Sequence, residues 1–164
     1  MNVRSMARIA VMSVLLGGLW ACGDSKQDLL GPDVADAELT TMLVSAIQDE
    51  YHAENVYLRV LADFGNVAPF ANIVNAEERH SAAVTVLFQN RGLEAPDSEW
   101  NSGNVPTFAS IAAACEGAYQ AEISNIEMYD EFLSAALPLD VTTVFENNRA
   151  ASLDRHMPAF LACK

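Results

Sequence analysis

Positively charged residues are scarce in this sequence. Lysine and arginine together number nine, against 22 aspartates and glutamates, and the formal net charge is −13. A protein that binds nucleic acid needs a basic face to displace counterions from the phosphates, so we expect no nucleic-acid partner. Net charge bears on solubility and association rather than on fold, so it leaves the fold open.

Several sequence signatures are also missing. There is no Gly-rich phosphate-binding loop, no Gly-x-Ser-x-Gly elbow, no low-complexity tract and no fixed-period repeat. Nothing alternates with a period of two for long enough to form a strand. The chain of 164 residues, 51% of them hydrophobic, is long enough for one domain with a sizeable core but not comfortably for two.

No hydrophobic run reaches the length of a transmembrane helix. The run Ile9–Trp20 has twelve residues, follows a start with two arginines, and ends in Leu19-Trp20-Ala21-Cys22. This order resembles a bacterial lipobox, in which the cysteine becomes the lipidated first residue of the mature protein. We therefore predict a signal peptide at residues 1–21, and a lipidated Cys22 with a polar tether at 22–35. The alternative is an ordinary secretory signal that contains a cysteine by chance.

Lipidation would place the protein in the bacterial cell envelope, with the membrane as its partner through the lipid anchor. Gly23 directly follows Cys22, and Asp24 comes one place later. The inner-membrane retention signal of enteric bacteria is an aspartate directly after the cysteine. The sequence therefore favours the outer membrane, with a domain that faces the periplasm. No motif indicates a protein partner.

Cysteine is rare, with three residues in the chain. If Cys22 carries lipid, Cys115 and Cys163 remain as a pair. An exported protein meets oxidising conditions, so a disulfide between these two is expected, and two free thiols are the alternative.

From residue 36 onward, apolar residues recur at the three-to-four spacing of helix faces. The spacing predicts four helices, over about residues 39–64, 70–87, 108–132 and 141–163. A loop from about Gly92 to Pro106 connects the second helix to the third, which is long for such a connection and enough to return along the whole length of its neighbours. We therefore predict an all-α fold, a four-helix bundle with a long crossover between its second and third helices.

Each predicted helix carries ionisable residues on its apolar stripe, near the middle of the helix. They are Glu50, Glu77 with His80, Glu122, and His156. Burial of a carboxylate on a core face costs free energy unless the carboxylate is paired or coordinated. The recurrence of ionisable residues on the core faces therefore indicates that they serve a common site. In an antiparallel hairpin, residues equidistant from the turn lie side by side, which brings all five into one layer. Cys115 and Cys163 are equidistant from the same turn as Glu122 and His156.

This arrangement resembles the ferritin-like di-metal carboxylate proteins, the group of ferritins and rubrerythrins. Their helices carry, in order, a Glu, a Glu-x-x-His, a Glu, and a second Glu-x-x-His or a reduced set. The resemblance covers about residues 36–163, so 36–164 is expected to be a ferritin-like four-helix domain. The stretches Gln48-Asp49-Glu50-Tyr51 and His156-Met157-Pro158-Ala159-Phe160 look like a poorly characterised bacterial branch of that group, known as domains of unknown function.

The resemblance implies a metal site that holds one or two ions of iron or manganese. The implied ligands are Glu50, Glu77, His80, Glu122 and His156. The fourth helix departs from the family plan, because Leu153 and not a glutamate stands three places before His156. Three carboxylates and two imidazoles favour a single tightly held ion, or two unequal ones, over a symmetric pair. The chain has no Cys-x-x-Cys pair, so the rubredoxin module of rubrerythrin is absent.

Two functions are compatible with these residues. One is an envelope-anchored metal-binding protein that acts as an oxidase or peroxidase. The other is a non-enzymatic envelope module whose buried Glu/His layer is a structural hydrogen-bond network. Tyr57 and Tyr129, seven places beyond Glu50 and Glu122, are expected chiefly to pack in the core; the alternative is that they donate hydrogen bonds to the ligands or trap radicals. His52 is expected on the surface.

Overall fold

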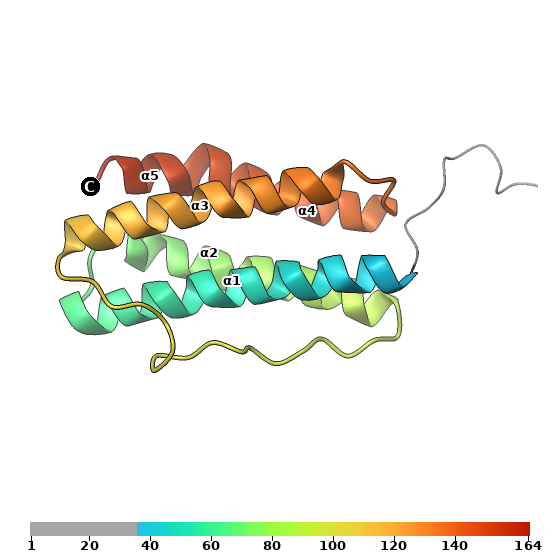
Figure 1. Ribbon diagram of the computed structural model, residues 1–164, viewed down its shortest axis with the longest axis horizontal. Helices are drawn as coiled ribbons and strands as arrows, with labels where there is room; N and C mark the ends of the chain where they lie inside the picture. Colours follow the sequence, from blue (N-terminus) through green and yellow to red (C-terminus); the bar gives the residue numbers. More distant parts are fainter. Residues whose placement is uncertain (1–35) are drawn as a thin grey trace, which may run out of the picture. The chain divides into compact units, whose positions relative to one another are not determined.

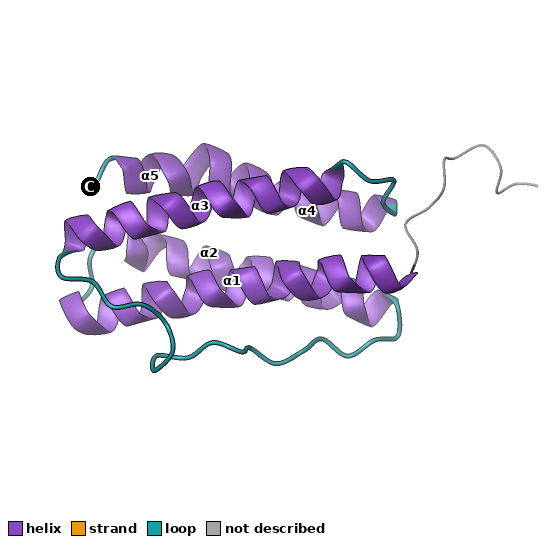
Figure 2. Cartoon of the chain, in the orientation of Figure 1, coloured by secondary structure: helices purple, strands orange, loops and turns teal. Residues whose placement is uncertain are grey.

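The computed structural model describes residues 36–164, and every regular element in that range is helical (Figure 2). The described residues contain no strand, as the hydrophobic pattern predicted. The predicted signal peptide at 1–21, the lipidation site Cys22 and the tether at 22–35 lie outside the described residues. None of the described helices combines the length and the hydropathy needed to cross a bilayer.

The first hairpin consists of α1 (Asp36–Phe64) and α2 (Phe70–Asn90), which lie side by side (Figure 1). Gly65 ends α1, and its backbone N–H donates to the carbonyl of Leu61 at 2.9 Å. Its φ of 84° lies in the left-handed region, which glycine adopts without a steric penalty, so the chain can leave the helix there. The turn thus falls where the sequence predicted it.

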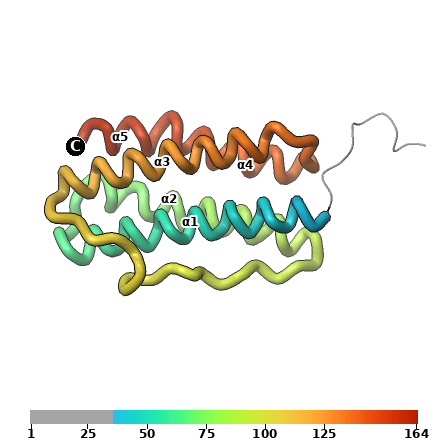
Figure 3. The backbone as a smooth tube through the Cα atoms, in the orientation of Figure 1, coloured from blue at the N-terminus to red at the C-terminus, as the bar shows by residue number. Residues whose placement is uncertain are grey.

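A long connection, residues 91–110, runs back along the first hairpin before the next helix begins (Figure 3). Gln48 on α1 holds it through two bonds: its Nε2 donates to the carbonyl of Asp97 at 2.8 Å, and its Oε1 accepts from the N–H of Glu99 at 3.0 Å. The ring of Trp100 lies 4.3 Å from that of His52. His52, which was expected on the surface, is partly buried because the connection packs against it.

The third helix, α3 (Ile111–Leu133), begins three residues later than the pattern predicted. Ser110 is its N-cap, and the Ser110 hydroxyl accepts a hydrogen bond from the N–H of Ala113. Phe108, which fits the helical spacing, instead lies in the connection and packs onto α3 at Gly117. A Cβ at Gly117 would come within 2.6 Å of the Phe108 ring, so this contact requires glycine.

The last helical rod is made of α4 (Leu139–Ala151), the π-helical turn η1 (Ser152–His156) and α5 (Met157–Leu161). The spacing predicted one continuous helix here, but this turn is π-helical: the N–H of Met157 bonds to the carbonyl of Ser152, five residues back. Pro158 supplies the physical reason. Proline has no N–H, and its ring collides with the carbonyl four residues earlier, so the wider turn relieves the clash.

Two apolar clusters fill the core, one toward each end of the helices. One contains Leu43, Ile47, Leu87, Phe88 and Phe145, and the other contains Val56, Val60, Phe70, Ala118 and Phe160. A disulfide joins Cys115 on α3 to Cys163 after α5, with their Cα atoms 5.8 Å apart. The polar layer that the sequence predicted lies between the two clusters.

Candidate metal centre

All five predicted ligands point into the polar layer at the middle of the helices. Glu50 comes from α1, Glu77 and His80 from α2, Glu122 from α3, and His156 from η1. The three carboxylates and His156 are each 3% exposed or less. Charged groups this deeply buried need partners, and the layer supplies them in two overlapping groups.

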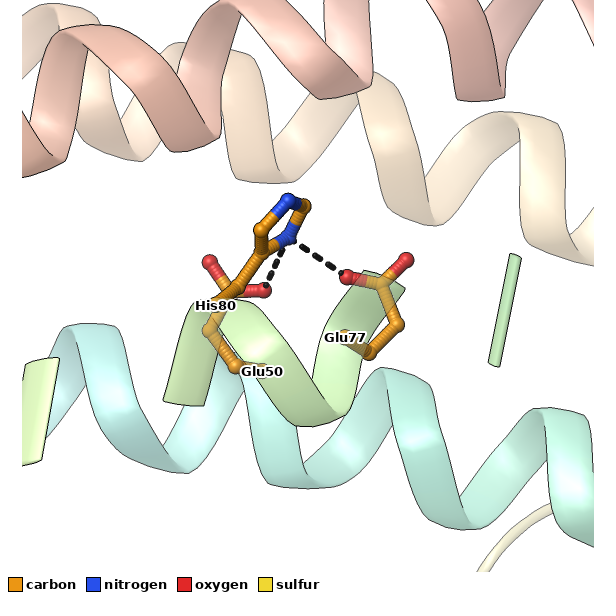
Figure 4. A group of neighbouring side chains, drawn as sticks. All are labelled: Glu50, Glu77 and His80. Carbon is orange, nitrogen blue, oxygen red and sulfur yellow. Dashed lines mark hydrogen bonds and ion pairs between the residues drawn. The ribbon is translucent and has the colours of Figure 1, made fainter. Parts of the chain in front are cut away.

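The first group is formed by Glu50, Glu77 and His80 (Figure 4). Nδ1 of His80 lies 3.2 Å from Oε2 of Glu50 and 3.0 Å from Oε2 of Glu77. The spacing of three residues between Glu77 and His80 places both side chains on one face of α2. Each residue offers a ligand atom within 4.8 Å of the others, so the group can hold a metal ion.

The second group is formed by Glu77, Glu122 and His156, again with ligand atoms within 4.8 Å of one another. Nδ1 of His156 lies 3.1 Å from Oε1 of Glu77 and 3.5 Å from Oε2 of Glu122. The imidazoles of His80 and His156 are stacked, with centroids 5.4 Å apart. Glu77 therefore belongs to both groups and turns a different oxygen toward each.

Two atoms of the second group are buried without a hydrogen bond to any described residue: Oε1 of Glu77 and Nδ1 of His156. They lie 3.1 Å apart, but their orientation does not make a hydrogen bond. A buried polar atom without a partner costs about 1–3 kcal/mol. A cation bound to both atoms would remove that cost, so the residues present fit a metal ion.

The protonation of the layer follows from its charges. Burial alone would lower the pKa of His80, but its hydrogen bonds to Glu50 and Glu77 and their charges outweigh burial and raise that pKa to about 10. The pKa of His156 is likewise lowered by burial and raised more by Glu122 and Glu77, to about 9. Burial raises the pKa of Glu50. Without a bound cation, both imidazoles are positively charged at neutral pH and offset part of the charge of the three carboxylates.

Two tyrosines orient the carboxylates from the opposite helix. The hydroxyl of Tyr57 on α1 donates to Oε1 of Glu122 at 2.6 Å, and that of Tyr129 on α3 donates to Oε1 of Glu50 at 2.6 Å. Asn148 on α4 donates to Oε1 of Glu50 at 3.3 Å. The tyrosines pack in the core, as expected, and also fix the carboxylates, which restricts how the layer can bind a ligand.

Sequence reasoning missed a series of hydrogen bonds beside the layer, which joins Asp49, Asn125 and Ser152. Nδ2 of Asn125 donates to Oδ2 of Asp49 at 2.7 Å, and the hydroxyl of Ser152 donates to Oδ1 of Asn125 at 2.9 Å. Burial raises the pKa of Asp49 to about 7, and the bond from Asn125 offsets part of the rise. Asn125 and Ser152 stand on the predicted stripes, which was a usable signal. Asp49 gave none, because it stands beside the stripe.

The π-helical turn changes what the fourth helix offers the layer. Ser152, not Leu153, lies on the buried face with His156 and is 2% exposed, while Leu153 is only partly buried. In the ferritin-like plan a glutamate stands three residues before the histidine, which is the position of Leu153 here. That α-helical spacing does not apply in this π-helical turn. The rod contributes His156 to the second group, with the hydroxyl of Ser152 and the amide of Asn148 nearby, and it contributes no carboxylate to either group.

Two cavities reach the layer from different sides. One, of about 190 Å³, is lined by residues of α1, α2 and α3 that include Asp49, Tyr57, Glu77 and Glu122. The other, of about 270 Å³, is lined by residues of α2, α4 and η1 that include the rings of His80 and His156. Small molecules and ions can therefore approach the carboxylate side and the imidazole side separately.

Fold and site together define an all-helical protein with a buried layer of carboxylates and histidines. The chain belongs to the family described as "Uncharacterized protein domain (DUF2202)", whose model matches residues 39–155. No curated protein matches the chain. A crystal structure of a hypothetical protein from Methanococcus jannaschii DSM 2661 is similar, with a TM-score of 0.69 and 22% sequence identity over 79% of this chain and 80% of that one. At this identity the likeness shows a shared fold and nothing about activity.

Proposed function

We propose that this protein is an envelope-anchored member of the ferritin-like group, a four-helix bundle that binds two divalent metal ions, iron or manganese, in unequal sites. The observation that carries the proposal is the position of Glu77. Its Oε2 lies 3.0 Å from Nδ1 of His80 and its Oε1 lies 3.1 Å from Nδ1 of His156. A carboxylate that faces a separate imidazole with each oxygen is suited to bridge two ions.

The residues around Glu77 complete the two sites. Glu50 and His80 would bind one ion and Glu122 and His156 the other, while Tyr129 and Tyr57 hold the outer carboxylates by hydrogen bonds. Three carboxylates leave two divalent ions with an uncompensated positive charge. Ions held by so few protein ligands would keep positions for other ligands, and together with this charge that would favour binding of a small anionic or oxygen-containing substrate.

The activity that we propose is oxidation driven by peroxide or oxygen. Bound iron or manganese supplies the redox chemistry, and carboxylate and imidazole ligands suit these metals. The chain's own residues supply the rest. The cavity beside Glu77 and Glu122 admits a small oxidant, and the apolar clusters on both sides of the layer exclude bulk water.

A second function has an observation in its favour. Both oxygens of Glu50 have partners without any metal: Oε1 accepts from Tyr129 and Asn148, and Oε2 pairs with His80. On this alternative, the layer is a structural network that fixes the register of the helices. It does not explain why Oε1 of Glu77 and Nδ1 of His156 lie buried without a hydrogen bond, which is why we favour the metal.

Metal content per chain, measured by elemental mass spectrometry on protein exported to the periplasm and purified without chelators, tests the proposal. We expect about two ions in the native protein, as in other proteins of this plan. Glu77→Gln should lose most of the metal because it removes the shared ligand, and Glu122→Gln should lose about half. Glu127→Gln is the matched control, since Glu127 is exposed on the same helix as Glu122.

The same measurement can reject the proposal. Metal-free protein, even after loading with ferrous iron, would favour the structural network. Unchanged metal content in folded Glu77→Gln protein would show that any bound metal lies elsewhere. Retention of the helical fold is checked by circular dichroism in each variant.

A further inference from the structure

The basic residues of the described part of the chain fall into two groups. Four of the six pair with a carboxylate: Arg59 with Asp63, Arg91 with Asp140, Arg149 with Asp130, and Lys164 with Glu116. The remaining two, Arg79 on α2 and Arg155 on η1, form no salt bridge with any described residue and are exposed. Both line the same cavity, between α2 and the rod formed by α4 and η1.

This cavity has about 270 Å³ and is mainly polar in its lining. Water in the liquid takes up about 30 Å³ per molecule, so the space suits a small polyatomic ion with some of its hydration. The acidic neighbours of the two arginines in the chain, Glu78 and Asp154, are not among its lining residues. In a chain with a net charge of −13, two arginines that face one cavity without carboxylate partners form a local positive site.

His80 and His156 also line the cavity, and their side chains are more deeply buried than those of the two arginines. Each ring turns Nδ1 toward the carboxylates, so its Nε2 is on the far edge, and Figure 4 shows this for His80. The side chain of His156 is only 4% exposed and makes no hydrogen bond to a described residue. With Nδ1 directed at a carboxylate or a metal ion, Nε2 carries a proton and is a donor without a partner.

We propose that this cavity is a binding site for a small inorganic oxyanion of the phosphate class, held by the guanidinium groups of Arg79 and Arg155 at its mouth and by Nε2–H of His80 and His156 at its base. Arginine presents donors in a planar fork that matches two oxygens of a tetrahedral oxyanion. The amide of Asn147 lies at the same mouth and adds a neutral donor. The site goes beyond metal binding, because it uses the edges of the imidazoles that face away from the carboxylates.

Isothermal titration with orthophosphate tests the proposal on the protein as purified and again after dialysis against a chelator. Ionic strength is held constant with sodium chloride, so that general screening does not change between injections. We expect one phosphate per chain in both preparations. Arg79→Gln and Arg155→Gln should each weaken binding by roughly tenfold, the usual effect of removing charged hydrogen bonds. Arg59→Gln removes the same charge from a paired arginine on α1 and should leave phosphate affinity within about twofold.

Three results would overturn the proposal. Phosphate could bind no better than chloride; it could bind equally well to both variants and to native protein; or it could bind only in the metal-containing preparation without regard to Arg79 and Arg155, which would place it on the metal. Because the two arginines are exposed and unpaired, we expect both variants to keep the native melting curve and the native metal content. A failure of this site is therefore distinct from a failure of the metal centre.

Discussion

The hydroxyl of Tyr57 lies 2.6 Å from Oε1 of Glu122 and is the one hydrogen-bond donor to that oxygen among the described residues. The equivalent contact in the other direction, from Tyr129 to Glu50, is backed up by Asn148, which donates to the same oxygen. Loss of the Tyr57 hydroxyl would leave Oε1 of Glu122 without a donor, whereas loss of the Tyr129 hydroxyl would leave Oε1 of Glu50 with Asn148 as its donor.

Tyr57→Phe should therefore destabilise the metal-free protein more than Tyr129→Phe does. Both changes keep the buried ring, but the first leaves a carboxylate oxygen without a donor, at a cost of about 1–3 kcal/mol. Urea unfolding of both variants and the native protein measures the difference. Equal losses would show that Asn148 does not support Glu50 as its geometry indicates.

The stability of the metal-free protein should fall as pH rises. The pKa of Asp49 is raised from 3.8 to about 7 by burial, and the pKa values of His80 and His156 are raised from 6.5 to about 10 and about 9 by their carboxylate neighbours. In each case the folded state binds more protons than the unfolded state, so each contribution favours folding at low pH. Asp49 opposes folding increasingly from pH 4 to 7, and the histidines lose their contribution from about 6.5 to 10.

Urea unfolding of chelator-treated protein at pH 5, 7 and 9 checks this dependence. The exposed aspartates Asp130 and Asp140 have lowered pKa values because of their arginine partners, so they act in the opposite sense, but only below about pH 4. Burial lowers the pKa of His52, which also acts in the opposite sense, but only below about pH 6.5. Stability that increases from pH 5 to 9 would contradict the protonation of the layer described above.

Metal binding should release protons. An imidazole must be deprotonated at Nδ1 before it can bind an ion there, and His80 and His156 hold their protons with pKa values of about 10 and about 9. Calorimetric titration with Mn²⁺ at pH 7 in buffers with different ionisation enthalpies measures the number of protons released. We expect about two protons per chain when both sites are filled. His80→Gln should reduce this number by about one, whereas His52→Gln, outside both groups, should leave it unchanged.

Removal of the disulfide should weaken the fold but spare the layer. The bond between Cys115 and Cys163 closes a loop with a sequence separation of 48, for which the loss is about 4 kcal/mol. Cys163→Ser and native protein with a reductant should melt at the same lowered temperature. Metal content near that of native protein is expected at temperatures where the variant remains folded.

If Cys22 carries lipid, its substitution should change where in the cell the protein is found. Cys22→Ser removes the thiol that would carry lipid, so the variant should leave the membrane fraction of the cells in which it is expressed. Fractionation followed by immunoblotting measures this. Equal amounts of variant and native protein in the membrane fraction would favour an anchor other than lipid.

The hydrophobic pattern was sufficient to predict the helices and their polar layer because both depend on the same spacing. Glu50 and Glu77 stand on the apolar stripes of α1 and α2, at similar distances along the chain from the turn at Gly65. In an antiparallel hairpin, such residues lie side by side. The π-helical turn at Ser152–His156 was missed because one extra residue in a turn hardly alters the period of the stripe. Pro158 was a local sign of it, because proline removes a backbone donor and loosens a helix.

Contacts made by the long connection were beyond sequence reasoning for another reason. Trp100 covers His52, and Phe108 packs onto Gly117, but no repeating pattern determines where an irregular segment crosses the helices. The buried position of Asp49 has the same origin, because Asn125 comes from a distant helix. Such contacts depend on tertiary packing, which the sequence of a single element does not specify.

The two groups that share Glu77 differ in the parts of the molecule that they connect. Glu50, Glu77 and His80 all belong to the first hairpin, so an ion held by them needs that hairpin alone. Glu122 and His156 come from the second, and an ion held by them and Glu77 would fasten the two hairpins together. No disulfide joins the hairpins among the described residues, since Cys115 and Cys163 both lie in the second half. The first ion would thus bind within one hairpin, whereas the second would link the two halves of the bundle, and its removal would break that link.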